Sequence, residues 1–275
     1  MISPELSTGI TIIFYSLAVA TGIAGMLTRR PILRKWGCCI ALAGFACQTL
    51  VLALGFHTAL PNGLSAGAYF QLMAWFIVLC GILAWVKLRQ EAPLIFAAPL
   101  GLMLFIMSAP FLTSVIVVPN LLSTAFYTLH VGALFLSLAI LSLAFAAGGL
   151  FLFLENRIKS KRSVTGVWMD MPALSMLDTI NAFAVVTGYP LFTLGILSGL
   201  VWAKPVFGST MTGDPKEVVS IIIWLLFSIL FHNRLARGWK GRKPAQLAVC
   251  IFLLCLFSVV VVNTLMESHH AFLKH

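Results

Sequence analysis

The side chains of this sequence best suited to bind a metal are histidines that lie in or beside long apolar segments. There are six of them: His57, His130, His232, His269, His270 and His275. A neutral imidazole is a common metal ligand and can bind a haem iron axially. Each histidine taken alone also has a plain structural interpretation, as a ring bonded to a neighbouring helix, an interfacial residue or part of a solvated tail. Both interpretations stay open on these residues alone.

The composition places these histidines in a membrane protein. Charged residues are 9% and apolar residues 60% of the 275 residues, whereas a soluble domain has about 25% charged residues. Segments of about 20 apolar residues are long enough to cross a bilayer. We find eight, at 6–27, 36–57, 66–86, 94–112, 121–154, 182–203, 215–233 and 245–266. Because backbone groups in lipid must bond within the chain, we predict an all-α integral membrane protein with eight transmembrane helices, forming one domain over 1–275.

The basic residues predict the orientation of these helices. All but three of the 18 Lys and Arg residues fall in alternate loops; the exceptions are Lys204, Lys216 and Lys274. By the positive-inside rule those loops are cytoplasmic and both termini are outside. The net charge of +10 then reflects topology and requires no nucleic-acid partner. On this topology His130 and His270 lie near the outer face and His232 near the inner face.

One polar segment precedes the sixth apolar segment, and another precedes the seventh. Asp214, Pro215 and Glu217 have the order of an N-cap, N1 and N3 set, in which the Asp accepts from free backbone N–H groups and the Glu reaches back. We therefore expect a helix to begin at 215. The segment 163–181 is too polar to cross a membrane, and its apolar residues at intervals of three, Trp168, Met171, Leu174 and Leu177, predict a short interfacial helix between the fifth and sixth spans.

Several of these segments together resemble the CcsA (ResC) family of system II cytochrome c biogenesis, within a haem-handling superfamily that includes CcmC, CcmF and the HemX branch. The stretches begin with "TLHV" at 128, "MPAL" at 171, "GDPKE" at 213 and "VNTL" at 262, and the strongest similarity covers about 128–272. A weaker extension lies at 55–75.

The resemblance implies roles for three histidines. His130, in the L-H-V context, and His270, favoured over His269 by its spacing after the last helix, match the two axial ligands of an outer haem iron. His232 matches a ligand of an inner haem, whose second ligand a partner subunit, CcsB (ResB), usually supplies.

One motif of the family departs from its pattern in this chain. The family has a tryptophan-rich stretch, W-G-x-Y-W-x-W-D-P-K-E, whereas residues 207–213 here contain no tryptophan or tyrosine. Such aromatic rings offer a large apolar surface to a porphyrin. Phe207 and Met211 keep part of that surface and Asp214 keeps the helix start, so the resemblance places these three residues beside haem.

The resemblance implies that the chain carries haem b and presents it on the outer face to an apocytochrome c, whose thiols add to the vinyl groups. The expected surroundings are the bacterial inner (cytoplasmic) membrane, and the expected partners are a CcsB/ResB-like subunit, apocytochrome c and the lipid bilayer. The chain has no nucleophile of its own, so whether it counts as part of a holocytochrome c synthase is left open. One alternative is a HemX-type regulator or accessory factor of haem synthesis, which the missing tryptophans favour. Another is a membrane module or transporter, against which the lack of carboxylates within the spans argues.

Overall fold

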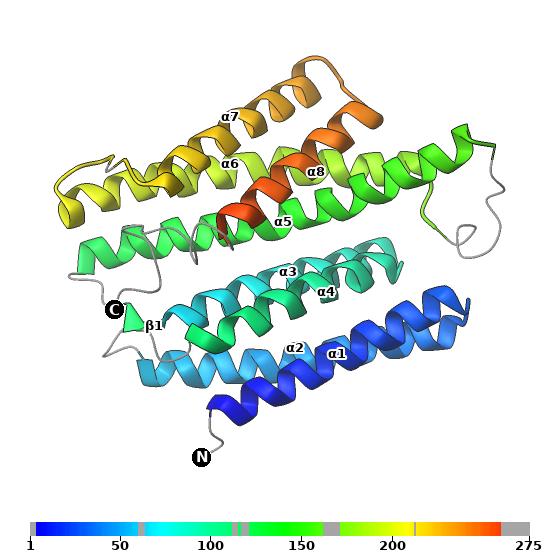
Figure 1. Cartoon of the computed structure of the whole chain (residues 1–275), viewed down its shortest axis with the longest axis horizontal. Coiled ribbons are helices and arrows are strands. Elements are labelled where there is room, and N and C mark those ends of the chain that lie inside the picture. The colour runs from blue at the N-terminus through cyan, green and yellow to red at the C-terminus, as the bar shows by residue number, and fades with distance from the viewer. Residues whose placement is uncertain are drawn as a thin grey trace. The chain divides into compact units, whose positions relative to one another are not determined.

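The computed structural model describes residues 4–59, 64–111, 115–116, 121–161, 171–211 and 213–259. These residues are almost entirely helical (Figure 1), and the helices are α1 Pro4–Leu27, α2 Pro31–Ala59, α3 Ala66–Leu88, α4 Ala92–Ser108, α5 Leu121–Lys159, α6 Leu174–Phe207, α7 Pro215–Ala236 and α8 Arg242–Phe257. A 3-10 turn, Ala109–Phe111, follows α4, and two short strands, β1 Leu64–Ser65 and β2 Val115–Ile116, pair antiparallel.

Seven of the described helices, α1 to α7, are long and apolar enough to cross a membrane. The predicted all-α integral membrane protein is therefore confirmed. The eighth expected span, 245–266, is described only as far as 259, and its first part is α8.

The chain divides into two compact units. One comprises Met1–Ile116 with Asn156–Pro172, and the other comprises Val117–Glu155 with Ala173–His275. The first unit thus contains α1–α4 and the second contains most of α5 with α6–α8. Because compactness does not say whether the units function together, the single haem-handling domain expected over 1–275 stays a prediction.

In the first unit, glycines let helices α1 and α2 approach each other closely. A Cβ atom added to Gly37 would lie 2.8 Å from the backbone nitrogen of Gly22, and one added to Gly25 would lie 2.6 Å from the backbone nitrogen of Arg34. Small residues at such crossings are typical of membrane helices, where close van der Waals contact replaces the hydrophobic effect. Beside this crossing lies an apolar core that includes Tyr15.

A buried hydrogen-bond network joins all four helices of this unit. The Tyr15 hydroxyl donates to Gln48 Oε1 at 2.5 Å, and Gln48 Nε2 donates to the backbone carbonyl of Gln71 at 2.7 Å. Gln71 Nε2 in turn donates to Ser108 Oγ at 3.3 Å and Thr8 Oγ1 at 3.5 Å. Since lipid offers no alternative partners, each of these bonds favours the assembled bundle.

In the second unit, three hydrogen bonds join α5 to α6 at intervals of seven residues on each helix. They link His130 to Gly195, Ser137 to Gly188 and Asn181 to Ala144. Seven residues are two helical turns, so all three bonds lie along one face of each helix. The numbers rise on α5 as they fall on α6, so the two helices run antiparallel. We call these three bonds the α5–α6 ladder.

Contacts between aromatic side chains join α7 and α8 to α6 and α5. Tyr189 of α6 contacts Phe227 and Phe231 of α7, with ring centroids 5.6 and 4.7 Å apart. Phe145 of α5 stacks on Phe252 of α8 at 4.6 Å. These contacts attach α7 and α8 to the pair of helices that the ladder joins.

The short interfacial helix predicted at 163–181 differs from the structure in its second half. Residues 162–170 lie outside the described ranges, whereas residues 174–181 form the first turns of α6 without a break. The physical reason is that the side chains of Asp178 and Asn181 point away from solvent, because both bond to α7 or to the loop that follows it.

We predict that replacing Gln48 by Met lowers the stability of the first unit by about 1–2 kcal/mol, because the Tyr15 hydroxyl and the Gln71 carbonyl lose a buried partner. Thermal unfolding in detergent measures the change. Thr21→Val is the matched control, since the Thr21 hydroxyl is exposed and bonds only within its own helix. Equal losses in both variants would show that the network adds no stability.

Candidate functional site

His130 lies in α5, and its ring is bonded to the neighbouring helix. The ring is half-buried, and its Nδ1 atom is 2.7 Å from the carbonyl oxygen of Gly195 in α6. The Ser198 hydroxyl donates to the same carbonyl at 3.0 Å. This histidine is therefore fixed to α6 at one ring nitrogen.

The surroundings of His130 come from one face of α6. The ring lies nearly parallel to the buried indole of Trp202, at an angle of 14° and a centroid distance of 6.4 Å. Tyr127, one turn earlier on α5, contacts the same indole at 5.0 Å. Gly199 leaves the space that the imidazole occupies. We call Gly195, Gly199 and Trp202 the His130 cradle.

The sequence contained a signal for this cradle that our interpretation missed. The stretch "GILSGLVW" at 195–202 places its two glycines and its tryptophan at positions i, i+4 and i+7, which is one face of a helix. By type and position alone, Trp202 fits the role of an interfacial aromatic residue equally well.

His232 has an environment opposite to that of His130. It is exposed, and it continues a row of exposed side chains at alternating spacings of four and three along α7: Val218, Ile222, Leu225, Ile229 and His232. The buried face of α7 carries Ile223, Phe227 and Leu230 instead. His232 therefore points away from the core of its own unit.

The start of α7 has the predicted cap. Asp214 is buried, its carboxylate accepts from the backbone N–H of Lys216 at 2.8 Å, and Pro215 is the first helical residue. Glu217 reaches back as expected: its Oε2 accepts from the N–H of Gly213, one residue before the cap, at 3.0 Å. The helix start predicted at 215 is confirmed.

The other expected site residues are placed in part. Met211 is exposed, and Phe207 is the last residue of α6, with a side chain outside the described set. His270 and His269 lie beyond residue 259, and the side chain of His57 is also outside the described set. Asp214 and His232 are separated by most of α7, about 25 Å at 1.5 Å per residue. They therefore belong to opposite ends of the second unit.

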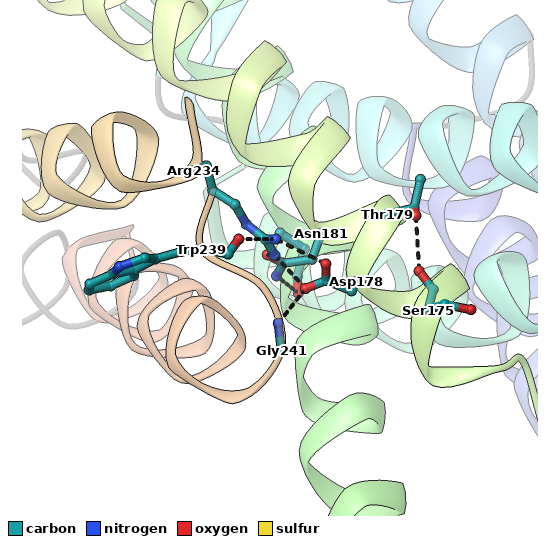
Figure 2. Close-up of polar contacts among 8 residues, drawn as sticks. Ser175, Asp178, Thr179, Asn181, Arg234, Trp239 and Gly241 are labelled. Carbon is teal, nitrogen blue, oxygen red and sulfur yellow. Dashed lines mark hydrogen bonds and ion pairs between the residues drawn. The ribbon is translucent and has the colours of Figure 1, made fainter. Parts of the chain in front are cut away.

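A buried ion pair at the basic end of this unit was not predicted. Figure 2 shows the Arg234 guanidinium against the Asp178 carboxylate, with Nη1 3.1 Å from Oδ2 and Nη2 3.0 Å from Oδ1. The guanidinium also donates to Asn181 Oδ1 at 2.6 Å and to the Trp239 carbonyl at 2.8 Å, and the Gly241 N–H donates to Asp178 at 2.8 Å. We call these five residues the Arg234 cluster.

The Arg234 cluster fixes the end of α7 two residues after His232. Only 4% of the Arg234 side chain and 15% of that of Asp178 are exposed. A buried charge of this kind needs a counter-ion and hydrogen bonds; both terminal nitrogens of the guanidinium have them, whereas its buried Nε has no hydrogen-bond partner among the described residues. Gly241 has a φ of +78°, a left-handed conformation that favours glycine. Because Asn181 belongs both to this cluster and to the ladder, the two arrangements are continuous.

No group of three His, Cys, Asp or Glu side chains that could hold a bare metal ion occurs among the described residues. The two histidines whose side chains are described, His130 and His232, lie singly, one toward each end of the second unit. A single imidazole is suited to serve as one axial ligand of an iron whose other ligands come from elsewhere.

Comparison with known proteins gives a family match. The model of the family described as cytochrome C assembly protein matches residues 66–270. The cytochrome c biogenesis protein CcsA of Chlamydomonas reinhardtii is 35% identical over 144 residues, which are 52% of this chain and 39% of that protein. CcsA of Prochlorococcus marinus (strain MIT 9301) is 30% identical over 241 residues, covering 78% of this chain and 76% of the relative. The chain thus matches about two fifths of the length of the Chlamydomonas protein.

We predict that Asp178→Ala destabilises the protein by about 3–5 kcal/mol, because it leaves the Arg234 guanidinium buried without its counter-ion. Thermal unfolding in detergent measures this loss. The matched control is Arg242→Ala, which removes the more exposed ion pair with Glu155 and is expected to cost less than about 1 kcal/mol.

If Asp178→Ala does not fold at all, the double variant Asp178→Ala, Arg234→Met separates the causes. Removing both charges should restore folding, since no unpaired charge then remains buried. A double variant as unstable as the single one would contradict the role given to the ion pair.

Proposed function

Because the chain belongs to the cytochrome c assembly protein family, we propose that it carries haem b in the membrane and presents it on the outer face for covalent attachment to apocytochrome c. The observation that carries this proposal is the setting of His130: a half-buried imidazole, bonded at one ring nitrogen and flanked by aromatic side chains. The expected setting is the bacterial inner membrane.

The surroundings of His130 fit a porphyrin in chemical terms. Haem is flat and mostly apolar, and aromatic side chains bury large apolar areas against such a surface. Trp202 and Tyr127 lie together beside His130 and offset part of what the tryptophan-free stretch at 207–213 lacks. In the proposed site His130 and His270 bind the iron axially. Met211, which is exposed, and Phe207 contact the porphyrin, and Asp214 holds the start of α7 beside them.

His232 is proposed as a ligand of a second, inner haem. Its exposure on the outward row of α7 supports a site that is completed by another polypeptide. A histidine that points away from the core of its own unit takes a second axial ligand from outside that unit. We propose that a CcsB/ResB-like subunit supplies it and that haem passes from this site to the outer one.

A second candidate function follows from the stretch 207–213. Its lack of tryptophan and tyrosine favours a HemX-type membrane regulator or accessory factor of haem synthesis, which need not attach haem. The two functions differ in whether haem b stays bound to the purified chain.

We predict that the chain copurifies with haem b from haem-replete cells and that His130→Ala or His270→Ala removes most of the low-spin absorption, since each deletes one of two axial imidazoles. Visible spectra of the purified proteins measure this. His269→Ala is the matched control and should keep its spectrum. A colourless wild-type protein would support the HemX-type function instead.

For the inner site, we predict that His232→Ala lowers the haem content of protein purified from cells but leaves the affinity of the outer site for added haem unchanged. Pyridine haemochrome assay gives the content, and titration of haem-depleted protein gives the affinity. Val218→Ala, at the other end of the same exposed row, is the control. Equal haem content in both variants would argue against an inward-to-outward route.

A further inference from the structure

We infer that α6 sets the tautomer and orientation of His130 before any ligand binds, with Gly195 and Gly199 as positioning residues, so that Nδ1 carries the ring proton and Nε2 is the nitrogen that binds a metal. That the metal is haem iron rests on the proposed function. The presetting of the ring does not, because it follows from contacts within α5 and α6.

The first step concerns the proton on the ring. The Nδ1 atom of His130 lies 2.7 Å from the carbonyl oxygen of Gly195. A carbonyl oxygen can only accept a hydrogen bond, so Nδ1 must carry the proton that is shared. A neutral imidazole has one N–H, and its other nitrogen then carries the in-plane electron pair that can bind a metal. Nε2 is therefore the nitrogen able to bind a metal.

The second step concerns the position of the ring. A Cβ atom added to Gly199 would lie 2.6 Å from Cε1 of His130, closer than real contacts allow. The imidazole thus rests directly on the α6 backbone, at a place that only glycine leaves open. Trp202 lies nearly parallel to it one turn further along. The ring cannot turn its Nδ1 edge away from α6 without losing both contacts.

The third step concerns the register of the two helices. Ser137 and Asn181 make the other two bonds of the α5–α6 ladder, at 2.8 and 3.1 Å, and both bonds are buried. Sliding α5 along α6 would break all three bonds together. The distance from His130 to Gly195 is therefore determined by the pairing of whole helices and does not depend on the ring alone.

This arrangement has a clear advantage for a metal ligand. Histidines that bind metals usually donate their second ring N–H to a carbonyl or carboxylate, which fixes the tautomer and the ring direction, and loss of such a partner commonly costs 10–100-fold in affinity. In the inferred role the Gly195 carbonyl is that partner, and Gly199 makes it reachable.

The experiment is nitrogen NMR of the full-length, haem-free protein with 15N-labelled histidine, in detergent micelles. Protonated and unprotonated ring nitrogens have well-separated shifts, and the difference from a His130→Gln spectrum assigns the residue. We expect a protonated Nδ1 and an unprotonated Nε2. A wild-type spectrum with the proton on Nε2, or an even mixture of tautomers, would overturn the inference without any variant.

Two glycine variants extend this test. Gly199→Ala should displace the ring and abolish the single-tautomer signal. Gly149→Ala is the control, because it makes the same change on α5 at a position outside the ladder, where an added Cβ atom has nothing within 4 Å. Its His130 signal should stay unchanged. If Gly199→Ala does not fold, Trp202→Phe replaces it, with a partial loss of the single tautomer expected; an unchanged signal in the variant measured would contradict the positioning role.

Haem titration of the same proteins separates this inference from the proposed function. We expect Gly199→Ala to bind haem at least 10-fold more weakly than wild type, with Gly149→Ala within about 3-fold. A single Nδ1-protonated tautomer in a wild-type protein that binds no haem would overturn the function and leave the presetting intact. Tight haem binding by Gly199→Ala would overturn the positioning role alone.

Discussion

The α5–α6 ladder is the constraint on which the second unit depends. In lipid, a polar group gains more from a partner on a neighbouring helix than it could from its surroundings, because the hydrocarbon offers no hydrogen bonds. A helical carbonyl already accepts one bond from the N–H four residues later, but its second lone pair stays available. At Gly195 and Gly188 the absent side chains bring that lone pair within reach of His130 and Ser137. The ladder thus satisfies the polar side chains of α5 and sets the register of both helices.

At its basic end the ladder passes into a different kind of interaction. Asn181 donates to α5 through its amide nitrogen and accepts from Arg234 through its oxygen. Neutral hydrogen bonds therefore join α5 and α6 along their membrane-spanning length, while the ion pair of Arg234 with Asp178 lies at the end of the helices. This order agrees with the cost of charge in lipid, which is highest at the bilayer centre and falls towards its surface.

The sequence predicted the elements of this structure well and their pairing poorly. Apolar length alone located the spans, and the Asp-Pro-Lys-Glu stretch located the start of α7, because both signals are local. The partners of Arg234 lie 56 and 53 residues away in Asp178 and Asn181, so no local pattern could reveal that these polar residues face inward. His130 was recognised by its type and context, whereas Gly199 and Trp202 were not, since a glycine and a tryptophan in a membrane helix have several equally good explanations. The expected partner of His130, His270, lies outside the described residues.

The two histidines whose side chains are described, His130 and His232, differ in how far their own unit holds the imidazole ring in place. His130 is held by its own unit: its ring is bonded, stacked and supported by α6. His232 lies on the exposed row of α7, and the Arg234 cluster fixes its helix but does not enclose its ring. If both bind haem iron, the second unit itself prepares the first ligand, whereas it leaves the second on an exposed row of side chains. This asymmetry suits the proposed transfer from the inner to the outer site, because the outer ligand is held by contacts that the second unit does not give to the inner one.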